Sequence, residues 1–226
     1  MESNFKQIVR EAFFYLFPSF CIVCNMPVET CYSFRLCKRC RQELLYVRDW
    51  EVAEFEKKLP NVDAFLSVFL YAGTFKKLLW LYKEKGMRQV ANLFYEHVLN
   101  LILSSGFLYP VVSVPSRPAR IKKRGFCHTG LLADRLNGYF RYKPGISLVF
   151  SDKATNIVSQ KELSAEERRK AVEGRFAASA EAVYCEESVI LLDDVCTTGS
   201  TLNECASVLK TSGVRRVVAL TLAIEL

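Results

Sequence analysis

The sequence has no apolar run that approaches the roughly 20 residues needed to cross a bilayer as a helix. The first 17 residues are apolar only in a short stretch, and Arg10 and Glu11 stand directly before it, which argues against a signal peptide. We expect residues 1–17 to form an amphipathic helix instead. These absences predict a cytoplasmic protein without membrane insertion.

Two common nucleotide-binding signatures are also missing. The chain contains neither a G-x-x-x-x-G-K-[ST] loop nor a G-x-G-x-x-G turn, so neither P-loop ATPases nor dinucleotide-binding folds fit. There are no internal repeats and no low-complexity segments. A length of 226 residues suits one α/β domain plus a small accessory module, and the net charge of +7 suggests an anionic partner, either nucleotide phosphates or nucleic acid.

Cysteine, by contrast, is plentiful, and four of the nine cysteines form a doubled motif. The stretch CIVCNMPVETCYSFRLCKRC places one C-x-x-C at Cys21 and Cys24 and a second at Cys37 and Cys40. Two such knuckles can complete a tetrahedral structural zinc site. A redox dithiol and simple packing are the alternatives, and Cys31 in the intervening loop is a possible replacement ligand.

The remaining cysteines are scattered, and packing is their default interpretation. They are Cys127, Cys185, Cys196 and Cys205. Cys196 also has to be weighed as a thiol nucleophile, but no histidine flanks it, so we expect a turn residue.

From Val62 onward, strand patterns alternate with helix patterns, which predicts an α/β fold with a doubly wound, mostly parallel sheet. We expect an N-terminal helix and zinc module over residues 1–60 and the α/β domain over residues 61–226. The expected strands lie within residues 62–73, 110–116, 147–150, 188–194 and 215–226. The expected helices lie within residues 74–86, 88–105, 130–140 and 200–213, with a further helix starting at Ser164.

The stretch VILLDDVCTTGSTL carries the most specific chemical pattern. An aliphatic strand ends on Asp193 and Asp194, and a turn rich in hydroxyl groups then leads into a helix. The turn residues are Thr197, Thr198, Gly199, Ser200 and Thr201. Ligands bind beyond the carboxyl ends of parallel strands, so this stretch is a candidate site.

The two halves of this stretch suit different parts of one ligand. Amides at a helix start attract phosphate, and Gly199 lets the backbone approach an anion closely. Carboxylates accept hydrogen bonds, so Asp193 and Asp194 suit the vicinal hydroxyls of a ribose, directly or through hydrated Mg²⁺. The pattern predicts a ribose 5-phosphate site, whereas an ordinary helix cap explains only one of the hydroxyl residues.

The same residues resemble the phosphoribosyl-pyrophosphate (PRPP) signature of type I phosphoribosyltransferases, and the whole chain resembles the ComF/GntX-like proteins. Besides the PRPP signature and the doubled C-x-x-C, three segments carry the wider resemblance: YAGTFKKLLWLYKEKG, VSVPSRPARIKKRGFCHTGLLADRL and SQKELSAEERRKAVEGRF. The chain departs from the family pattern at Glu84, Cys127, His128 and Ala171. The resemblance implies the type I phosphoribosyltransferase fold and an association with DNA uptake and competence.

Carried over by position, the resemblance implies that Asp193 and Asp194 bind the ribose of PRPP and that residues 197–201 bind its 5-phosphate. Ser116 and Arg117 would face the pyrophosphate. The basic residues from Arg120 to Arg124 would form a mobile loop closing over it. Arg117 and Arg124 are the candidate catalytic residues.

Two further positions stay open at this stage. Lys83 matches a lysine of the family, but it is also an ordinary surface helix lysine. His128, one of two histidines, is either a helix-start residue or a catalytic group.

Three functions are compatible with these features. The first is a phosphoribosyltransferase, for which the acceptor is not readable from the sequence. The second is a non-catalytic protein that binds PRPP or single-stranded DNA, with the basic stretch and the CKRCR knuckle along the phosphate backbone. The third is a PRPP-sensing regulator.

Overall fold

The computed structural model describes residues 19–28, 35–151, 174–180 and 187–226. The helices expected at residues 1–17 and from Ser164 lie outside these residues, as do Cys31, Cys185 and Ala171. Within the described part, none of the helices has the length and apolar character that a membrane span requires.

The chain forms two compact units, which are treated separately below. One consists of residues 1–45 and 72–93, and the other of residues 46–71 and 94–226. The domain boundary expected near residue 60 stays a prediction.

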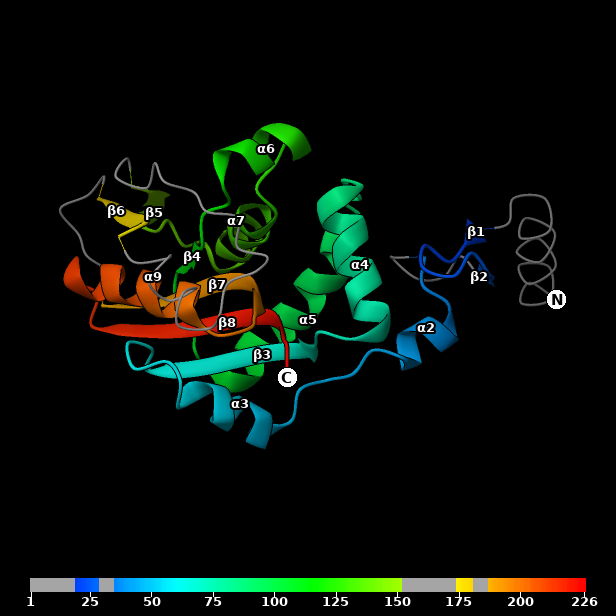
Figure 1. Cartoon of the computed structure of the whole chain (residues 1–226), viewed down its shortest axis with the longest axis horizontal. Helices are drawn as coiled ribbons and strands as arrows, with labels where there is room; N and C mark the ends of the chain where they lie inside the picture. The colour runs from blue at the N-terminus through cyan, green and yellow to red at the C-terminus, as the bar shows by residue number, and fades with distance from the viewer. Residues whose placement is uncertain (1–18, 29–34, 152–173, 181–186) are drawn as a thin grey trace, which may run out of the picture. The chain divides into compact units, whose positions relative to one another are not determined.

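The second unit is built on a four-stranded parallel sheet (Figure 1). Its order is β3 (Ala64–Leu70), β8 (Arg216–Ile224), β7 (Ser188–Cys196) and β4 (Val111–Ser113). The two central strands, β7 and β8, consist largely of aliphatic residues buried on both faces, as parallel strands require. The parallel sheet confirms the predicted α/β class.

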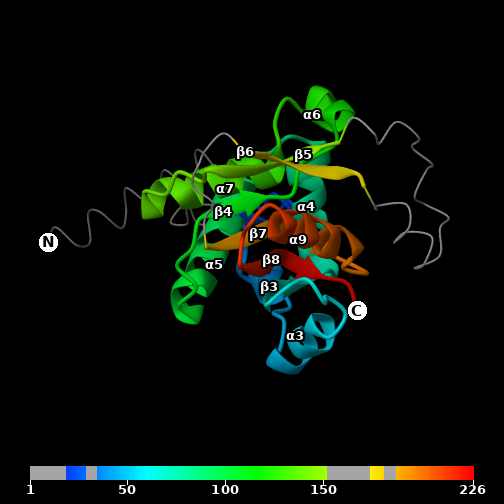
Figure 2. The ribbon, with the colours of Figure 1, turned by 90° about the vertical axis from the view of Figure 1, so that its left-hand side faces the viewer.

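Helices cover both faces of this sheet, as a doubly wound fold requires. Figure 2 shows α9 (Ser200–Thr211) on one side and α5 (Val90–Ser105) and α7 (His128–Phe140) on the other. Helix α3 (Asp49–Glu56) packs into the same core as α9, where Phe55 joins Leu202.

Only one strand of a second, two-stranded sheet was predicted. Strand β5 (Ile146–Phe150) matches the predicted strand, but it pairs antiparallel with β6 (Phe176–Ala180), which the sequence did not indicate. The sequence of β6, FAASA, lacks the β-branched residues typical of strands. Its strand conformation comes from pairing with β5, a contact between residues about 30 positions apart that local patterns cannot reveal.

Strand β7 is longer than predicted. We expected the strand to end on the acid pair, but it continues to Cys196 because Val195 and Cys196 still pair with β8. Both acids therefore lie inside the paired part of β7, close to its carboxyl end, and the pairing with β8 holds their backbone in place.

The basic stretch expected as a mobile loop is instead a short helix, α6 (Pro118–Arg124). Pro118 starts the helix, where its missing N–H is not needed. Gly125 ends it in the left-handed conformation, with φ of 78°, and donates its N–H to the Ile121 carbonyl. The lysines and arginine of the last turn favour the helix further, because positive charge is stabilising at a helix C-terminus.

In the described part of the first unit, a β-hairpin is followed by helices α2 (Lys38–Gln42) and α4 (Gly73–Glu84). Strands β1 (Ser19–Phe20) and β2 (Pro27–Val28) pair antiparallel to form the hairpin. The Thr74 hydroxyl donates to the Glu43 carboxylate over 2.8 Å, which ties the start of α4 to the end of α2.

Candidate functional site

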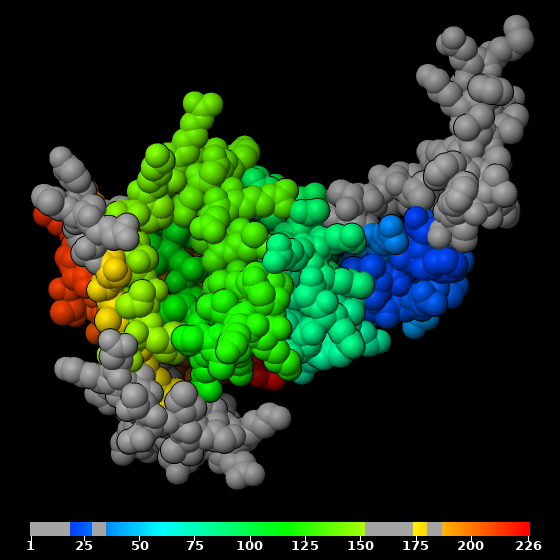
Figure 3. All heavy atoms as spheres, turned by 90° about the horizontal axis from the view of Figure 1, so that it is seen from above, coloured from blue at the N-terminus to red at the C-terminus, as the bar shows by residue number. Residues whose placement is uncertain are grey.

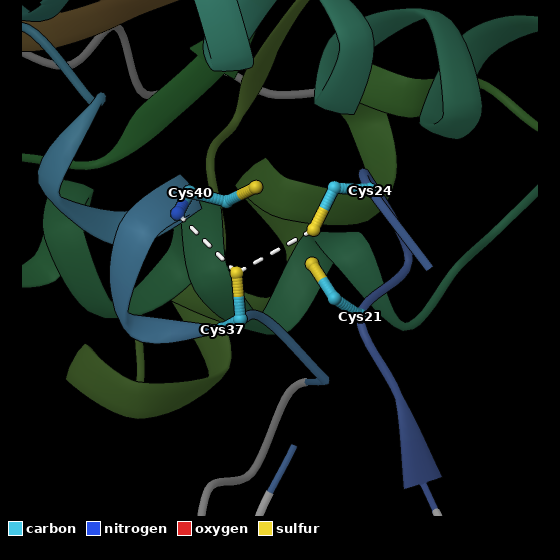
Figure 4. A group of neighbouring side chains, drawn as sticks. All are labelled: Cys21, Cys24, Cys37 and Cys40. Atoms are coloured by element: carbon cyan, nitrogen blue, oxygen red, sulfur yellow. Dashed lines mark hydrogen bonds between the residues drawn. The ribbon is translucent and has the colours of Figure 1, made fainter. Parts of the chain in front are cut away.

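The four cysteines of the doubled motif converge in the first unit (Figure 4). Cys21 and Cys24 lie in the turn between β1 and β2, Cys37 caps α2, and Cys40 lies within α2. Their sulfur atoms all lie within 4.8 Å of one another, and the Cys24 and Cys37 sulfurs are 3.5 Å apart. Four thiolates on one tetrahedral ion have sulfurs about 3.8 Å apart, so the cluster fits a closed metal site.

Backbone hydrogen bonds preorganise this cluster for a metal. The Asn25 N–H donates to the Cys21 carbonyl and the Cys21 N–H to the Met26 carbonyl, both over 2.8 Å, which forms the first knuckle. Burial raises the pKa of Cys21, but backbone N–H groups, chiefly that of Cys37, lower it to about 7 overall. A thiolate is the metal-binding form, so these N–H groups favour the form of Cys21 that binds a metal.

The acid pair lies at the carboxyl edge of the parallel sheet in the second unit. Asp193 and Asp194 are half-buried on β7, and the Asp193 carboxylate accepts the Asp194 N–H over 2.8 Å. The Asp194 carboxylate contacts the Nε2 atom of His128. This edge is where open α/β sheets bind ligands.

The hydroxyl-rich turn connects β7 to α9, as predicted. The Thr198 and Ser200 hydroxyls are 2.9 Å apart, and Gly199 caps α9. Gly199 has φ of +75°, and a Cβ atom there would lie 2.3 Å from the Cδ2 of Leu59. The glycine is therefore required by backbone conformation and by packing, in addition to the open approach it gives an anion.

The loop after β4 lies beside the acid pair because β4 is the neighbour of β7. The Val114 N–H donates to the Leu192 carbonyl over 2.8 Å, which continues the pairing beyond β4. Ser116 Oγ lies 3.3 Å from His128 Nδ1, and Arg124 Nη1 lies 3.4 Å from the same atom. The His128 ring thus brings together residues from three segments that the sequence analysis had treated separately.

Arg117 caps α6, whose exposed residues face the viewer in Figure 3. Burial lowers the pKa of Arg117, and the positive charges of Arg120 and Arg175 lower it further. Arg175 was missed by the sequence analysis. It stands just before β6, and only the pairing of β5 with β6 places its charge near Arg117.

Cys127 and Cys196 differ in their surroundings. Cys127 caps α7, and its sulfur accepts the Gly130 N–H over 3.3 Å. Burial raises the pKa of Cys127, but hydrogen bonds, chiefly those with Ser116 and Thr129, lower it overall. Burial raises the pKa of Cys196 to about 12, which supports packing over a nucleophilic role.

Lys83 lies on α4, in the unit that holds the cysteine cluster and not in the unit that holds the acid pair. Its role at the acid pair stays a prediction.

The chain is similar to proteins that are already known. Residues 121–224 match the family model for the phosphoribosyl transferase domain, a region that includes β7, β8, the acid pair and the hydroxyl-rich turn. The chain is also 27% identical over 204 residues to Competence protein F of Haemophilus influenzae, which covers 87% of this chain and 86% of that protein. Together with the parallel sheet and the cysteine cluster, these similarities support a ComF-like protein with the phosphoribosyltransferase fold.

Proposed function

We propose that the second unit binds PRPP together with Mg²⁺ at the carboxyl edge of its sheet. The observation that carries the proposal is the meeting of the acid pair with the loop after β4. The contacts of His128 join Asp194 to Ser116 and Arg124. Carboxylates, a hydroxyl and a guanidinium therefore lie at one edge, which supports a ligand with a ribose between two phosphate groups.

Each part of the site has a part of PRPP to hold. Asp193 and Asp194 accept hydrogen bonds from the ribose hydroxyls. The turn over residues 197–201 and the backbone amides at the start of α9 bind the 5-phosphate. Ser116 and Arg117 face the pyrophosphate, which a guanidinium can hold through two parallel hydrogen bonds.

Mg²⁺ fits the same site because carboxylate and phosphate oxygens are its preferred ligands. Asp193 and Asp194 would hold the ion with the ligand, and the ion would neutralise charge on the pyrophosphate. Arg117 and Arg124 would stabilise that charge from the protein side.

We propose zinc for the cysteine cluster, because four thiolates in a closed tetrahedral set suit this ion best. The paired thiols also need a reducing compartment, which supports a cytoplasmic location. The similar protein is named for competence, and on that ground we propose a role in DNA uptake for this chain.

Calorimetry with PRPP and MgCl₂ tests the proposed site. We expect zinc-loaded wild type to bind, and Asp193→Asn and Asp194→Asn each to bind roughly 10- to 100-fold more weakly, because a hydrogen bond to a charged group contributes about 1.5–3 kcal/mol. Asn keeps the size of the side chain but loses the charge that attracts hydroxyl donors and Mg²⁺.

Asp63→Asn is the matched control. Asp63 is an exposed carboxylate of the same unit that pairs with Lys210 and accepts the Val217 N–H at the other end of the sheet. It should leave PRPP affinity unchanged. Folded wild type that does not bind PRPP would refute the proposal, and release of pyrophosphate across a panel of bases and amines separates a transferase from a binding protein.

A second candidate function, single-stranded DNA binding, is favoured by aromatic side chains at the amino-terminal edge of the sheet. The Arg216 guanidinium lies 5.2 Å from the Phe107 ring, and the Phe107 and Tyr109 rings are 6.0 Å apart. Leu108 lies between these two aromatic residues in the sequence. Its carbonyl accepts a hydrogen bond from the hydroxyl of Tyr142, a further aromatic residue at the end of α7. Aromatic faces and arginines together are typical of single-strand binding surfaces.

Binding of a fluorescent oligothymidylate at several salt concentrations tests this surface. We expect Phe107→Ala with Arg216→Gln to weaken binding roughly 10-fold or more, since stacking contributes about 1–3 kcal/mol per base. Lys122→Gln with Lys123→Gln, on exposed helix α6, is the comparison for the basic stretch named above. A loss confined to the α6 variant would instead place the DNA along that helix, and no loss in either would count against both surfaces.

A further inference from the structure

The His128 ring lies between the two halves of the proposed PRPP site, and its position suggests a role that the resemblance does not supply. Only 7% of its side chain is exposed. Its Nε2 atom contacts the Asp194 carboxylate, and its Nδ1 atom lies within 3.4 Å of Ser116 Oγ and Arg124 Nη1. One ring therefore touches the ribose end and the pyrophosphate end of the site.

The partners of the ring determine which nitrogen carries the proton. A guanidinium only donates hydrogen bonds, so Nδ1 must accept the bond from Arg124. A neutral imidazole with an accepting Nδ1 carries its hydrogen on Nε2, and this hydrogen points to the Asp194 carboxylate, which only accepts. The Ser116 hydroxyl can also donate to Nδ1, so these three contacts agree with one tautomer.

We propose that His128, as the neutral Nε2–H tautomer, is a positioning residue that holds Asp194 for the ribose and Arg124 for the pyrophosphate. This inference rests on the proposed PRPP site. His128 is not assigned a catalytic role, because each of its polar contacts named above is to the protein.

The arrangement explains how three separate segments keep a fixed geometry. Asp194 comes from β7, Ser116 from the loop after β4, and Arg124 from the last turn of α6. Helix α6 has only 7 residues, and none of them is buried, so packing alone does not fix Arg124. A hydrogen bond to a nearly buried ring supplies that constraint.

The bridge is compatible with an occupied site. A carboxylate offers about four positions to donors, so a ribose hydroxyl can donate to Asp194 while His128 stays in place. Likewise, Arg124 has five donor hydrogens, and the bond to Nδ1 leaves others to face a phosphate. Ligand binding therefore does not require the ring to leave.

The tautomer can be measured without any ligand. We expect two-bond ¹H–¹⁵N correlation spectra of the full-length, zinc-loaded protein at neutral pH to show His128 as the Nε2–H tautomer. The chain has two histidines, so His97→Gln assigns the signals. Arg124→Met should shift the Nδ1 resonance, because it removes the donor to that atom. An Nδ1–H tautomer or an imidazolium at neutral pH would overturn the inference.

Ligand affinity tests the positioning role with a pair of substitutions. Glutamine keeps one donor and one acceptor, whereas leucine has similar bulk but neither. We expect His128→Leu to weaken binding of PRPP with MgCl₂ roughly 10- to 100-fold and His128→Gln to recover most of that loss, since hydrogen bonds to charged groups are the strong ones.

A second comparison separates positioning from packing. Arg124→Met should weaken PRPP binding less in the His128→Leu background than in wild type, because the residues act through one contact network. Equal affinities for the Leu and Gln variants, or fully additive effects, would overturn the role. If folded wild type does not bind PRPP, the proposed function fails, while the tautomer spectra still decide whether the bridge exists.

Discussion

Cys24→Ser is expected to weaken zinc binding about 100-fold or more. Cys24 is exposed, so its thiol contributes little to packing, and its loss acts through the metal. Structural zinc sites bind with about 10–16 kcal/mol, and losing one of four thiolates removes roughly a quarter of this, or about 100-fold in affinity or more. Metal analysis together with competition against a chromogenic chelator measures both the stoichiometry and the affinity.

Cys127→Ser is the matched control for this change. Cys127 is the same residue type, but it caps α7 in the second unit and is not one of the four cysteines of the cluster. Its substitution should leave about one zinc per chain. Undiminished zinc binding in the Cys24 variant would show that the cluster does not use this ligand.

The cysteine cluster and the acid pair could both be predicted from the sequence because each is a local feature. A C-x-x-C turn fixes the direction of two thiols within four residues. Similarly, the aliphatic run before Asp193 could only be a buried strand in an α/β pattern, and the hydroxyl-rich turn had to follow at its carboxyl end. Local apolar patterns likewise predicted the segments that form β3, α4, α5, α9 and β8.

Most of the features that the sequence analysis missed depend on distant residues. The position of Arg175 follows from the pairing of β5 with β6. The role of His128 follows from the neighbouring positions of β4 and β7, which bring residues 66 positions apart into contact. The prediction of a loop for the basic stretch rested on the family resemblance and not on the residues at its two ends. Pro118 and Gly125 are ordinary helix boundaries, and this local signal would have predicted α6.

Gly199→Ala is expected to destabilise the second unit by roughly 2–5 kcal/mol. The left-handed conformation at φ of +75° costs alanine about 1–2 kcal/mol. The new methyl group would lie 2.3 Å from Leu59 Cδ2, and overpacking of this kind costs about 1–3 kcal/mol. Thermal unfolding followed by circular dichroism should show a Tm lower by ~5–15 °C. PRPP binding should weaken as well, because the turn proposed to hold the 5-phosphate must move.

Gly138→Ala provides the control for this substitution. Gly138 is an exposed residue of α7 with no atom within 4 Å of an added Cβ. Alanine there should leave stability unchanged or raise it by about 0.5–1 kcal/mol, since glycine is unfavourable within helices. A similar loss in both variants would mean that the site at Gly199 has no special constraint.

The steric and conformational contributions at Gly199 can be separated with Leu59. Leu59 is buried, so Leu59→Ala costs about 2–5 kcal/mol by itself. It also removes the Cδ2 atom that the new methyl group would meet. In that background, Gly199→Ala should cost only the conformational part, about 1–2 kcal/mol. The double mutant should then be about 1–3 kcal/mol more stable than additivity predicts. Strict additivity would show that the turn moves away from Leu59 at no cost, so that the chain conformation alone requires the glycine.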